Sequence, residues 1–414
     1  MPNLPVLVVG GGIAGLSCAV RLAEAGRTVK VFESSDAVGG RIRTDEVDGF
    51  LLDRGFQVLL TAYPEAQAVF ELDELQLGRF EAGALVWFDG KFHRLVDPWR
   101  RPRYALATAL SPVGSLADKL RLASLRRRVT HGPLQARYEQ PETTTIEYLQ
   151  QRGFSERMLN RFFRPFLGGI FLDADLTTSS RMFEFVFRMF STGDAVLPAK
   201  GMGELPRQLT ARLPSDAMQT NSPVTEVGSR HIVLEGGRRV DGSEVVVATE
   251  APAAAQLCGE KFREEFNTVA CVYFSADQPP IDEGILLLNG DGSGPINNMC
   301  VPSNVCPTYA PAGKALISAS VLNAKGDDDS LTCEVRQQLQ QWFGEQVLSW
   351  KHLRTYRIAY ALPHQDPPAL SPVEKPATTA AGIFVCGDHR DTASIQGAMA
   401  SGRRAAEAVL ATHT

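Results

Sequence analysis

The stretch VLVVGGGIAGLSCAVRLAEAG, residues 6–26, decides how this chain begins to fold. Its first four residues form a continuous apolar run, which is typical of a parallel strand buried on both faces. From residue 13 to residue 25 apolar residues recur at helical spacing, and Gly26 is expected to end the helix. The run TVKVFE at 28–33 reads as a second strand. The sequence therefore predicts a strand–helix–strand unit of the Rossmann type.

Three glycines stand between the first strand and the helix, at G-x-G-x-x-G spacing. Gly10 permits the tight turn, Gly12 lets the backbone approach a pyrophosphate, and Gly15 lets the helix lie close to the strand. The phosphates are expected on the helix N-terminus. Glu33 stands at about the ~20-residue spacing at which an acid accepts hydrogen bonds from an adenosine ribose. These features together predict a dinucleotide site.

The stretch ESSDAVGGRIRT at 33–44 resembles the signature of a flavoprotein superfamily that contains monoamine oxidases, protoporphyrinogen oxidases and phytoene desaturases. Gly39, Gly40 and Arg41 match its second glycine pair and its arginine. The resemblance implies FAD as the cofactor, with the planar, permanently charged Arg41 near the diphosphate. LLDRGFQVLL at 51–60 resembles the next segment of the family, in which Asp53 and Gly55 approach the flavin ring.

The C-terminal stretch FVCGD at 384–388 resembles the strand that returns to complete the cofactor site in this superfamily. The resemblance implies that Asp388 binds the ribityl chain or approaches the pyrophosphate. It also implies that the helix starting near Gln396 points its backbone N–H groups at the flavin pyrimidine, where a helix N-terminus stabilises negative charge. The cofactor-binding residues implied in this way are Gly10, Gly12, Ile13, Ala14, Gly15, Glu33, Ser34, Gly39, Gly40, Arg41, Val224, Gly387, Asp388, Ser394, Ile395, Gln396 and Ala398.

The expected fold class is α/β, with a discontinuous Rossmann-like FAD-binding domain and an inserted α+β substrate-binding domain. The first insert reads as mainly helical, and the second carries strand-like runs such as NTVACVYFS followed by a helix after GDDDS. The FAD-binding domain is predicted from 1–60, 196–255 and 376–414, and the substrate-binding domain from 61–195 and 256–375.

Composition narrows the function further. The chain has 414 residues, 44% hydrophobic and 21% charged, which is ordinary for a globular protein. A net charge of −5 gives no general attraction to nucleic acid. Seven cysteines without C-x-x-C spacing disfavour a disulfide framework or a metal site and fit a reducing compartment. Because the first apolar run forms a strand and no apolar run reaches 18 residues, we expect a cytoplasmic protein.

The stretch 99–128 holds eight Lys and Arg residues and one acid, with leucines between them. A basic amphipathic helix beside an aromatic residue is how a protein lies on an anionic membrane surface. The other interpretation is a solvated helix face. The stretch therefore predicts either peripheral membrane contact or an ordinary charged surface.

Two departures from amine-oxidising relatives bear on the substrate. Our alignment places Cys271 where those relatives carry a lysine, and Ser394 where they carry an aromatic residue. The form Ser394-x-x-Gly397 resembles the phytoene desaturase branch instead. We therefore expect removal of a hydride from a lipophilic substrate of the isoprenoid or polyene type. Amine oxidation, porphyrinogen oxidation and a non-catalytic flavin-binding role remain the alternatives, and desaturation is not distinguished from isomerisation.

Such a site requires no nucleophilic side chain, because the flavin accepts the hydride while the protein orients the substrate and excludes water from the pocket. No catalytic side chain or metal ligand is assigned. With no second G-x-G-x-x-G unit, oxygen, a quinone or another acceptor is expected to take the electrons. For Tyr356 and Tyr360 the alternative to a cavity role is packing in the core. For His389 the alternative is a loop that forms hydrogen bonds with its own backbone. The candidates for a substrate cavity are Gln57, Cys271, Tyr356, Tyr360 and His389.

Overall fold

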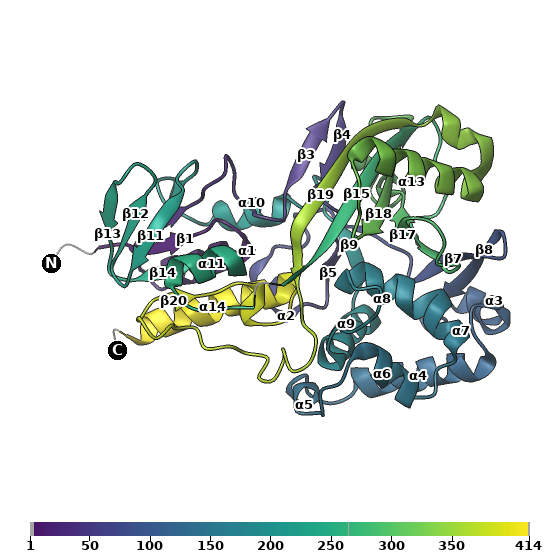
Figure 1. Ribbon diagram of the computed structural model, residues 1–414, viewed down its shortest axis with the longest axis horizontal. Coiled ribbons are helices and arrows are strands. Elements are labelled where there is room, and N and C mark those ends of the chain that lie inside the picture. The colour runs from purple at the N-terminus through teal and green to yellow at the C-terminus, as the bar shows by residue number, and fades with distance from the viewer. Residues whose placement is uncertain (1–3, 264, 413–414) are drawn as a thin grey trace.

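The computed structural model describes residues 4–263 and 265–412, and a five-stranded sheet organises one end of it (Figure 1). Every neighbouring pair in this sheet is parallel. Strands from both ends of the chain therefore meet in one sheet, as the Rossmann-like prediction requires. The strand order is β10 (Met218–Gln219), β2 (Val29–Phe32), β1 (Val6–Val9), β14 (Val245–Val247) and β20 (Phe384–Val385).

Two helices pack against each other beside this sheet, α1 (Ile13–Glu24) and α14 (Ile395–Ala411), the latter drawn in yellow in Figure 1. Their approach is close, because a Cβ at Gly402 would stand 2.3 Å from the carbonyl oxygen of Ala14. A Cβ at Gly15 would stand 2.1 Å from the carbonyl oxygen of Gly10. Only glycine allows both contacts, so the small residues of the C-terminal helix bring the two ends of the chain together.

A small antiparallel sheet and two helices complete this half. The sheet pairs β11 (Val224–Gly228), β12 (His231–Leu234) and β13 (Arg239–Asp241). Gly236 and Gly237 turn between the last two strands with φ of +86° and +83°, a backbone conformation that favours glycine. The helices are α10 (Glu204–Thr210) and α11 (Ala251–Cys258).

A seven-stranded sheet organises the other half of the molecule (Figure 1). The helix α13 (Asp328–Phe343) packs on it and is capped by Asp327, as the acids of GDDDS predict. The strand order is β19 (Lys351–Pro363), β15 (Phe266–Ala276), β18 (Ala315–Leu322), β17 (Ile296–Cys300), β16 (Leu286–Asn289), β7 (Gly83–Phe88) and β8 (Lys91–Val96).

The last two strands of that sheet come from the first insert, which the sequence predicted to be mainly helical. Asp89 and Gly90 turn between them with φ of +52° and +71°. An Asp-Gly pair between apolar runs is a hairpin signal that the helical interpretation passed over. The first insert therefore contributes to the sheet as well as to the helical layer.

The rest of the first insert is helical. Ser155 caps α7, and a π-helical turn, Leu159–Phe163, joins α7 to α8, with Pro165 in the first turn of α8. The helices are α3 (Ala105–Leu110), α4 (Leu116–Thr130), α5 (Gln135–Tyr138), α6 (Thr145–Gln151), α7 (Glu156–Met158), α8 (Arg164–Phe171) and α9 (Ser180–Thr192).

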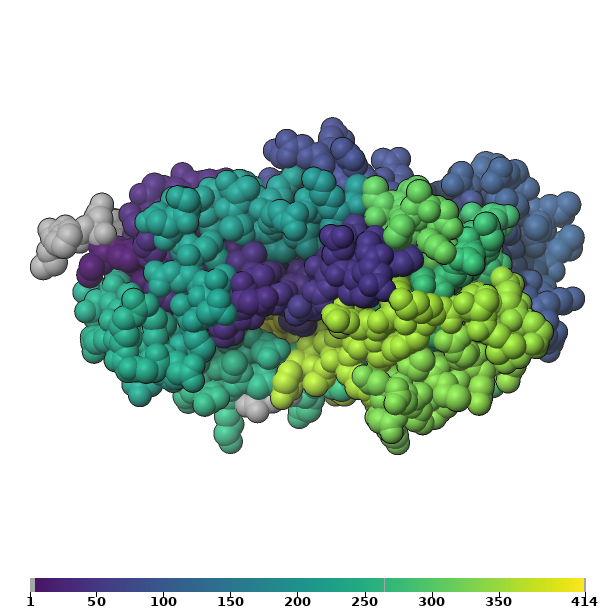
Figure 2. Space-filling model, turned by 90° about the horizontal axis from the view of Figure 1, so that it is seen from above, coloured from purple at the N-terminus to yellow at the C-terminus, as the bar shows by residue number. Residues whose placement is uncertain are grey.

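Short elements connect the two halves. In the view of Figure 2, the hairpin of β3 and β4 lies between the teal segment and the yellow-green strand β19. Within the described residues, no helix is long and apolar enough to cross a membrane. The connecting elements are β3 (Thr44–Val47), β4 (Phe50–Asp53), β5 (Leu59–Leu60), α2 (Pro64–Val69), β6 (Gly78–Arg79), β9 (Ala195–Leu197) and α12 (Pro302–Val305).

Candidate functional site

A cavity of about 840 Å³ opens at the carboxyl ends of the parallel strands, and we call it the large cavity. Ligands of open parallel sheets bind at this edge. Most of the residues implied for cofactor binding line it, although they come from four separate stretches of sequence. They are Gly10, Gly12, Ile13, Ala14, Glu33, Ser34, Gly39, Gly40, Arg41, Val224, Gly387, Asp388, Ser394, Ile395 and Ala398.

The glycines leave the space that a dinucleotide needs. Gly10 has a φ of +110°, and a Cβ there would stand 2.8 Å from the carbonyl oxygen of Ala248. Gly12 caps α1, lines the large cavity, and has no atom within 4 Å of where its Cβ would be. Backbone N–H groups of the first helical turn thus face an open cradle, and the residues fit a pyrophosphate.

Glu33 lies directly after β2 and is 8% exposed. Its Oε2 accepts a hydrogen bond from the Gly11 N–H at 2.7 Å, and its Oε1 accepts one from the Ser35 N–H at 2.9 Å. The carboxylate is therefore held in place by the backbone at the edge of the large cavity. Oε1 also accepts from the Ser35 hydroxyl at 2.7 Å, whereas Oε2 has capacity for a further bond, so Oε2 of Glu33 can also accept from a ribose hydroxyl.

Arg41 and Asp388 meet across the large cavity, from opposite ends of the chain. A guanidinium nitrogen of Arg41 lies 2.8 Å from Oδ2 of Asp388, and another donates to the carbonyl of Ala361 at 2.9 Å. Burial by itself lowers the pKa of Arg41, but the carboxylate of Asp388 outweighs that effect and raises the pKa. A fixed positive charge therefore lies in the cavity where the resemblance implies a diphosphate.

The C-terminal helix begins at the wall of the large cavity. Ser394 caps it by accepting a hydrogen bond from the Gly397 N–H at 3.0 Å. The Gln396 side chain is turned toward α2, where its Oε1 accepts from the Glu65 N–H at 2.9 Å. Gln396 and Gly15 do not line the cavity, so Gln396 can serve a ligand only through its backbone.

The remaining wall of the large cavity is largely apolar and comes from the insert helices and the segment that follows β4. Gln57 lies here, with its Nε2 bonded to the carbonyl of Arg41 at 2.8 Å and its buried Oε1 unpaired. Among the described residues of this wall there is no lysine. Its apolar members include Phe56, Val58, Ile170, Leu172, Met182, Val186 and Phe190.

Four of the five candidates for a substrate cavity lie outside the lining of the large cavity. Cys271 is fully buried between strands, with its Sγ 3.2 Å from the Ser318 hydroxyl. Tyr356 donates to Asp45 at 2.7 Å, and Tyr360 is 47% exposed on β19. Burial lowers the pKa of His389 to about 4, and its ring lies 5.5 Å from that of Phe262. Gln57 alone of the five lines the cavity.

Asp53 joins the hairpin of β3 and β4 to the turn at residues 200–203, which lies behind the large cavity. Its Oδ1 accepts from the Met202 N–H at 2.9 Å, and its Oδ2 accepts from the Tyr309 hydroxyl at 2.8 Å. Burial raises the pKa of Asp53 to about 6, despite these bonds. The role that the structure assigns to this side chain is therefore to position the segment that lines the cavity.

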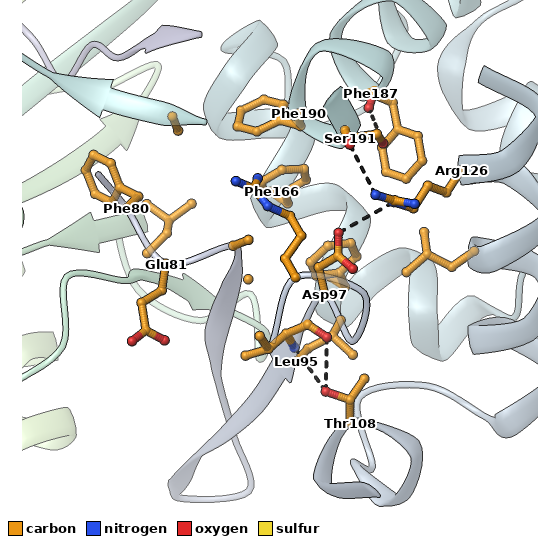
Figure 3. A pocket seen from close by; sticks show the side chains of 18 of the residues that line it. Phe80, Glu81, Leu95, Asp97, Thr108, Arg126, Phe166, Phe187, Phe190 and Ser191 are labelled. Atoms are coloured by element: carbon orange, nitrogen blue, oxygen red, sulfur yellow. Dashed lines mark hydrogen bonds and ion pairs between the residues drawn. The ribbon is translucent and has the colours of Figure 1, made fainter. Parts of the chain in front are cut away.

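A second cavity, of about 250 Å³, adjoins the first, and we call it the apolar cavity (Figure 3). It lies among β7, β8, the loop after β8, and the helices α4, α8 and α9. Phenylalanines dominate the wall, as apolar and aromatic side chains do in ligand pockets. Five residues line both cavities, Phe56, Val58, Gly169, Ile170 and Phe190.

The sequence interpretation missed two groups of residues. Thr249 and Glu250 follow β14 after Ala248 and line the large cavity, and polar residues at the carboxyl end of a parallel strand were a signal that could have found them. The Thr249 hydroxyl is buried and unpaired, which suits a ligand contact. The phenylalanines of the apolar cavity carry no comparable local pattern.

Comparisons with known proteins agree with this geometry. The model of the family described as flavin containing amine oxidoreductase matches residues 13–410. Hydroxysqualene dehydroxylase of Rhodopseudomonas palustris is 25% identical, with 98% of each chain covered. Coproporphyrinogen III oxidase of Mycobacterium bovis is 27% identical over 42% of this chain, which spans only 38% of that relative. A putative protoporphyrinogen oxidase from Exiguobacterium sp. 255-15 shares the fold over the full length of both chains, with a TM-score of 0.76 at 18% identity.

Proposed function

Because the chain belongs to the family of flavin-containing amine oxidoreductases, we propose that it removes a hydride from a lipophilic substrate of the isoprenoid or polyene type. The chain is a flavin oxidoreductase with FAD as its cofactor. We propose the large cavity as the place where FAD binds and the apolar wall of that cavity as the substrate side. The division into a discontinuous FAD-binding domain and an inserted substrate-binding domain is part of the same proposal.

The apolar cavity is the observation that carries this substrate class. A wall of seven aromatic residues next to the large cavity offers a hydrocarbon many contacts, and the described lining of the large cavity holds no lysine of the kind that amine-oxidising relatives carry. The full-length similarity to hydroxysqualene dehydroxylase, whose name denotes an isoprenoid alcohol, supports the same class. The aromatic residues of the wall are Phe56, Phe80, Trp99, Phe162, Phe166, Phe187 and Phe190.

In the proposed reaction a C–H bond of the substrate breaks, the hydride leaves, and a proton is lost from the neighbouring carbon to water. When bound, FAD would supply the hydride acceptor, and oxygen, a quinone or another acceptor would take up the two electrons. The apolar wall excludes water and orients the chain, and the unpaired Oε1 of Gln57 can accept a hydrogen bond from a substrate hydroxyl. Arg41 and the N-terminus of α1 hold the diphosphate.

Anaerobic mixing of the FAD-loaded protein with one member of each substrate class tests the proposal. We expect phytoene or a related isoprenoid hydrocarbon to bleach the flavin absorbance, while putrescine leaves it unchanged. Bleaching by coproporphyrinogen III alone would overturn the isoprenoid class in favour of porphyrinogen oxidation, the alternative that the partial similarity to coproporphyrinogen III oxidase favours. Bleaching by no class would favour a non-catalytic flavin-binding role.

We also propose that the protein contacts an anionic membrane through α3 and α4. Four leucines, at i and i+4 on each helix, are 62–74% exposed, and Trp99 nearby is 56% exposed. Arg101 and Arg103 are exposed beside them, whereas the partly exposed Arg100 side chain is paired with Asp194. We call Trp99, Leu106, Leu110, Leu116 and Leu120 the leucine face. Exposed leucines with a basic surround suit an interfacial segment.

The structure changes which residues of the stretch 99–128 are candidates for lipid contact. Leu125 is buried, Arg126 lies 3.5 Å from Asp97, and Arg128 donates to Glu184 at 3.3 Å. Leu125 therefore packs inward, and carboxylates of the protein pair with the two arginines. Helical spacing alone did not reveal which side of α4 packs against α9. The leucines of α3 and the first turns of α4 are the exposed ones.

Sedimentation with vesicles tests this contact. Leu106→Ser with Leu110→Ser should abolish sedimentation with phosphatidylglycerol vesicles, while FAD content stays normal. Leu348→Ser provides the control, because Leu348 is 58% exposed but lies far along the chain in the helical turn after α13. Failure of the unaltered protein to sediment with these vesicles would leave the leucine face as an ordinary surface.

A further inference from the structure

The apolar cavity has a wall that offers a ligand almost no free polar group. The Thr108 hydroxyl donates to the carbonyl of Val96 at 3.1 Å, and the Ser191 hydroxyl donates to the carbonyl of Phe187 at 2.7 Å. Glu81 is an exception, because its buried Oε2 lies 3.7 Å from Arg94 and has no hydrogen-bond partner among the described residues. An apolar cavity of about 150 Å³ is known to stay dry and to bind benzene, so a cavity of about 250 Å³ has room for a larger hydrocarbon.

The inner end of the apolar cavity adjoins the large cavity. Phe190 and Ile170 stand in the wall between them, and Gly169 lines both sides. A Cβ at Gly169 would stand 2.6 Å from Oδ1 of Asn298, so this backbone is packed as closely as glycine permits. A chain that lies in one cavity therefore needs to pass only these shared residues to enter the other.

The outer end is closed by a salt bridge under an indole ring. Nε of Arg126 lies 3.5 Å from Oδ2 of Asp97, and its guanidinium lies 5.0 Å from the centre of the Trp99 ring. Arg126 also donates to the carbonyl of Ser191 at 3.2 Å (Figure 3). An ion pair this long and partly exposed contributes little to stability, so it can open at small cost.

This closure lies beside the leucine face. Trp99 belongs to both, and α4 presents Leu116 and Leu120 to solvent while Leu122 and Ala123 line the apolar cavity. Lys119 ties α4 to α3 through the carbonyl of Ala109 at 2.8 Å. The outer end of the cavity is thus bordered by the exposed leucines and arginines of the stretch 99–128.

We propose that the apolar cavity is a second ligand site, which takes an aliphatic or polyene chain through an outer gate formed by Asp97, Trp99 and Arg126. The reacting end of the same molecule then reaches the large cavity past Phe190. This proposal rests on the proposed function for its substrate class, because the chain is that of the lipophilic substrate. The binding site itself is testable without turnover.

Binding of cis-parinaric acid, a conjugated polyene whose fluorescence rises in apolar surroundings, provides the test on the FAD-loaded protein. Ala123→Phe fills the cavity from α4 and should weaken probe binding about tenfold or more, equivalent to ~1.4 kcal/mol. Ser124→Phe is the matched control, because Ser124 is exposed on the same helix. Equal probe affinity in both variants would overturn the proposal.

A second filling variant, Ala195→Leu, approaches the cavity from β9 and covers the case in which Ala123→Phe does not fold. For the gate, Asp97→Asn should speed probe association several-fold in stopped-flow measurements, and an unchanged rate would overturn the gate. The experiments distinguish failure of the proposed substrate class from failure of the proposed cavity site. Isoprenoids would then leave the flavin unbleached while Ala123→Phe still weakens the probe, whereas bleaching with unaltered probe binding would reject the cavity site alone.

Discussion

The large cavity and the apolar cavity adjoin each other but are built from different parts of the protein. Backbone, glycines and charged side chains such as Glu33, Arg41 and Asp388 line the cofactor end of the large cavity, whereas phenylalanines from separate helices line the apolar cavity. Space in the first depends on residues that lack a side chain, and space in the second depends on the size of the side chains present. Substitutions in the first should therefore alter cofactor binding, and those in the second should alter ligand binding with the cofactor retained.

The largest effect is expected for Gly12→Val. Gly12 has an ordinary φ of −73°, and no atom lies within 4 Å of its missing Cβ, so the apoprotein should fold with an unchanged melting temperature. The new side chain would occupy the cofactor space. We expect the FAD dissociation constant to rise about 1,000-fold, or ~4 kcal/mol.

Titration of the apoprotein with FAD measures this loss, with Ala25→Val at the exposed end of the same helix as the control. If Gly12→Val retains FAD, the open space at Gly12 is not where the cofactor lies. The contrast between the two cavities would then no longer rest on the glycines.

The sequence also predicts the large cavity better than the apolar cavity. The turn at Gly10, the acid Glu33 and the return strand before Asp388 each follow from local chemistry, because a close backbone approach permits few residue types. The shared wall at Phe190 and the gate at Arg126 do not, because a phenylalanine at helical spacing packs in a core or lines a cavity with equal ease. Only the packing of α4, α8 and α9 decides between the two.

The next effect concerns acid stability of the large cavity. His389 lies behind Gly387, and burial lowers its pKa to about 4 from an unfolded value near 6.5. Between these values the unfolded chain binds more protons, so stability falls as the pH is lowered from about 6.5 to 4. The full loss for ~2.5 units is about 3 kcal/mol.

His389→Phe should remove this part of the pH dependence, because neither ring nitrogen has a hydrogen-bond partner among the described residues and Phe262 offers an aromatic neighbour. Urea unfolding of both proteins at pH 7 and pH 4.5 measures the difference. Parallel pH profiles for the two proteins would show that the buried imidazole does not cause the loss of stability at low pH.

Glu33→Ala is expected to weaken FAD binding by about 1.5–3 kcal/mol, because it removes a charged acceptor for the ribose hydroxyls. Glu33→Gln should lose less, since the amide oxygen still accepts a hydrogen bond. The dissociation constant of FAD from each variant gives the comparison. An unchanged constant would mean that another residue of the large cavity holds the ribose.

The smallest effect comes from a pair of helix caps, one in each region. Ser394 accepts from the Gly397 N–H at 3.0 Å at the wall of the large cavity, and Ser115 accepts from the Asp118 N–H at 3.1 Å at the start of α4. Loss of either cap by Ser→Ala should cost about 1 kcal/mol of stability. Only Ser394→Ala should also weaken FAD, by a few-fold, because only its helix starts in the cofactor wall. If both variants weaken FAD equally, the two cavities are coupled through the fold, and a change in one cannot be interpreted apart from the other.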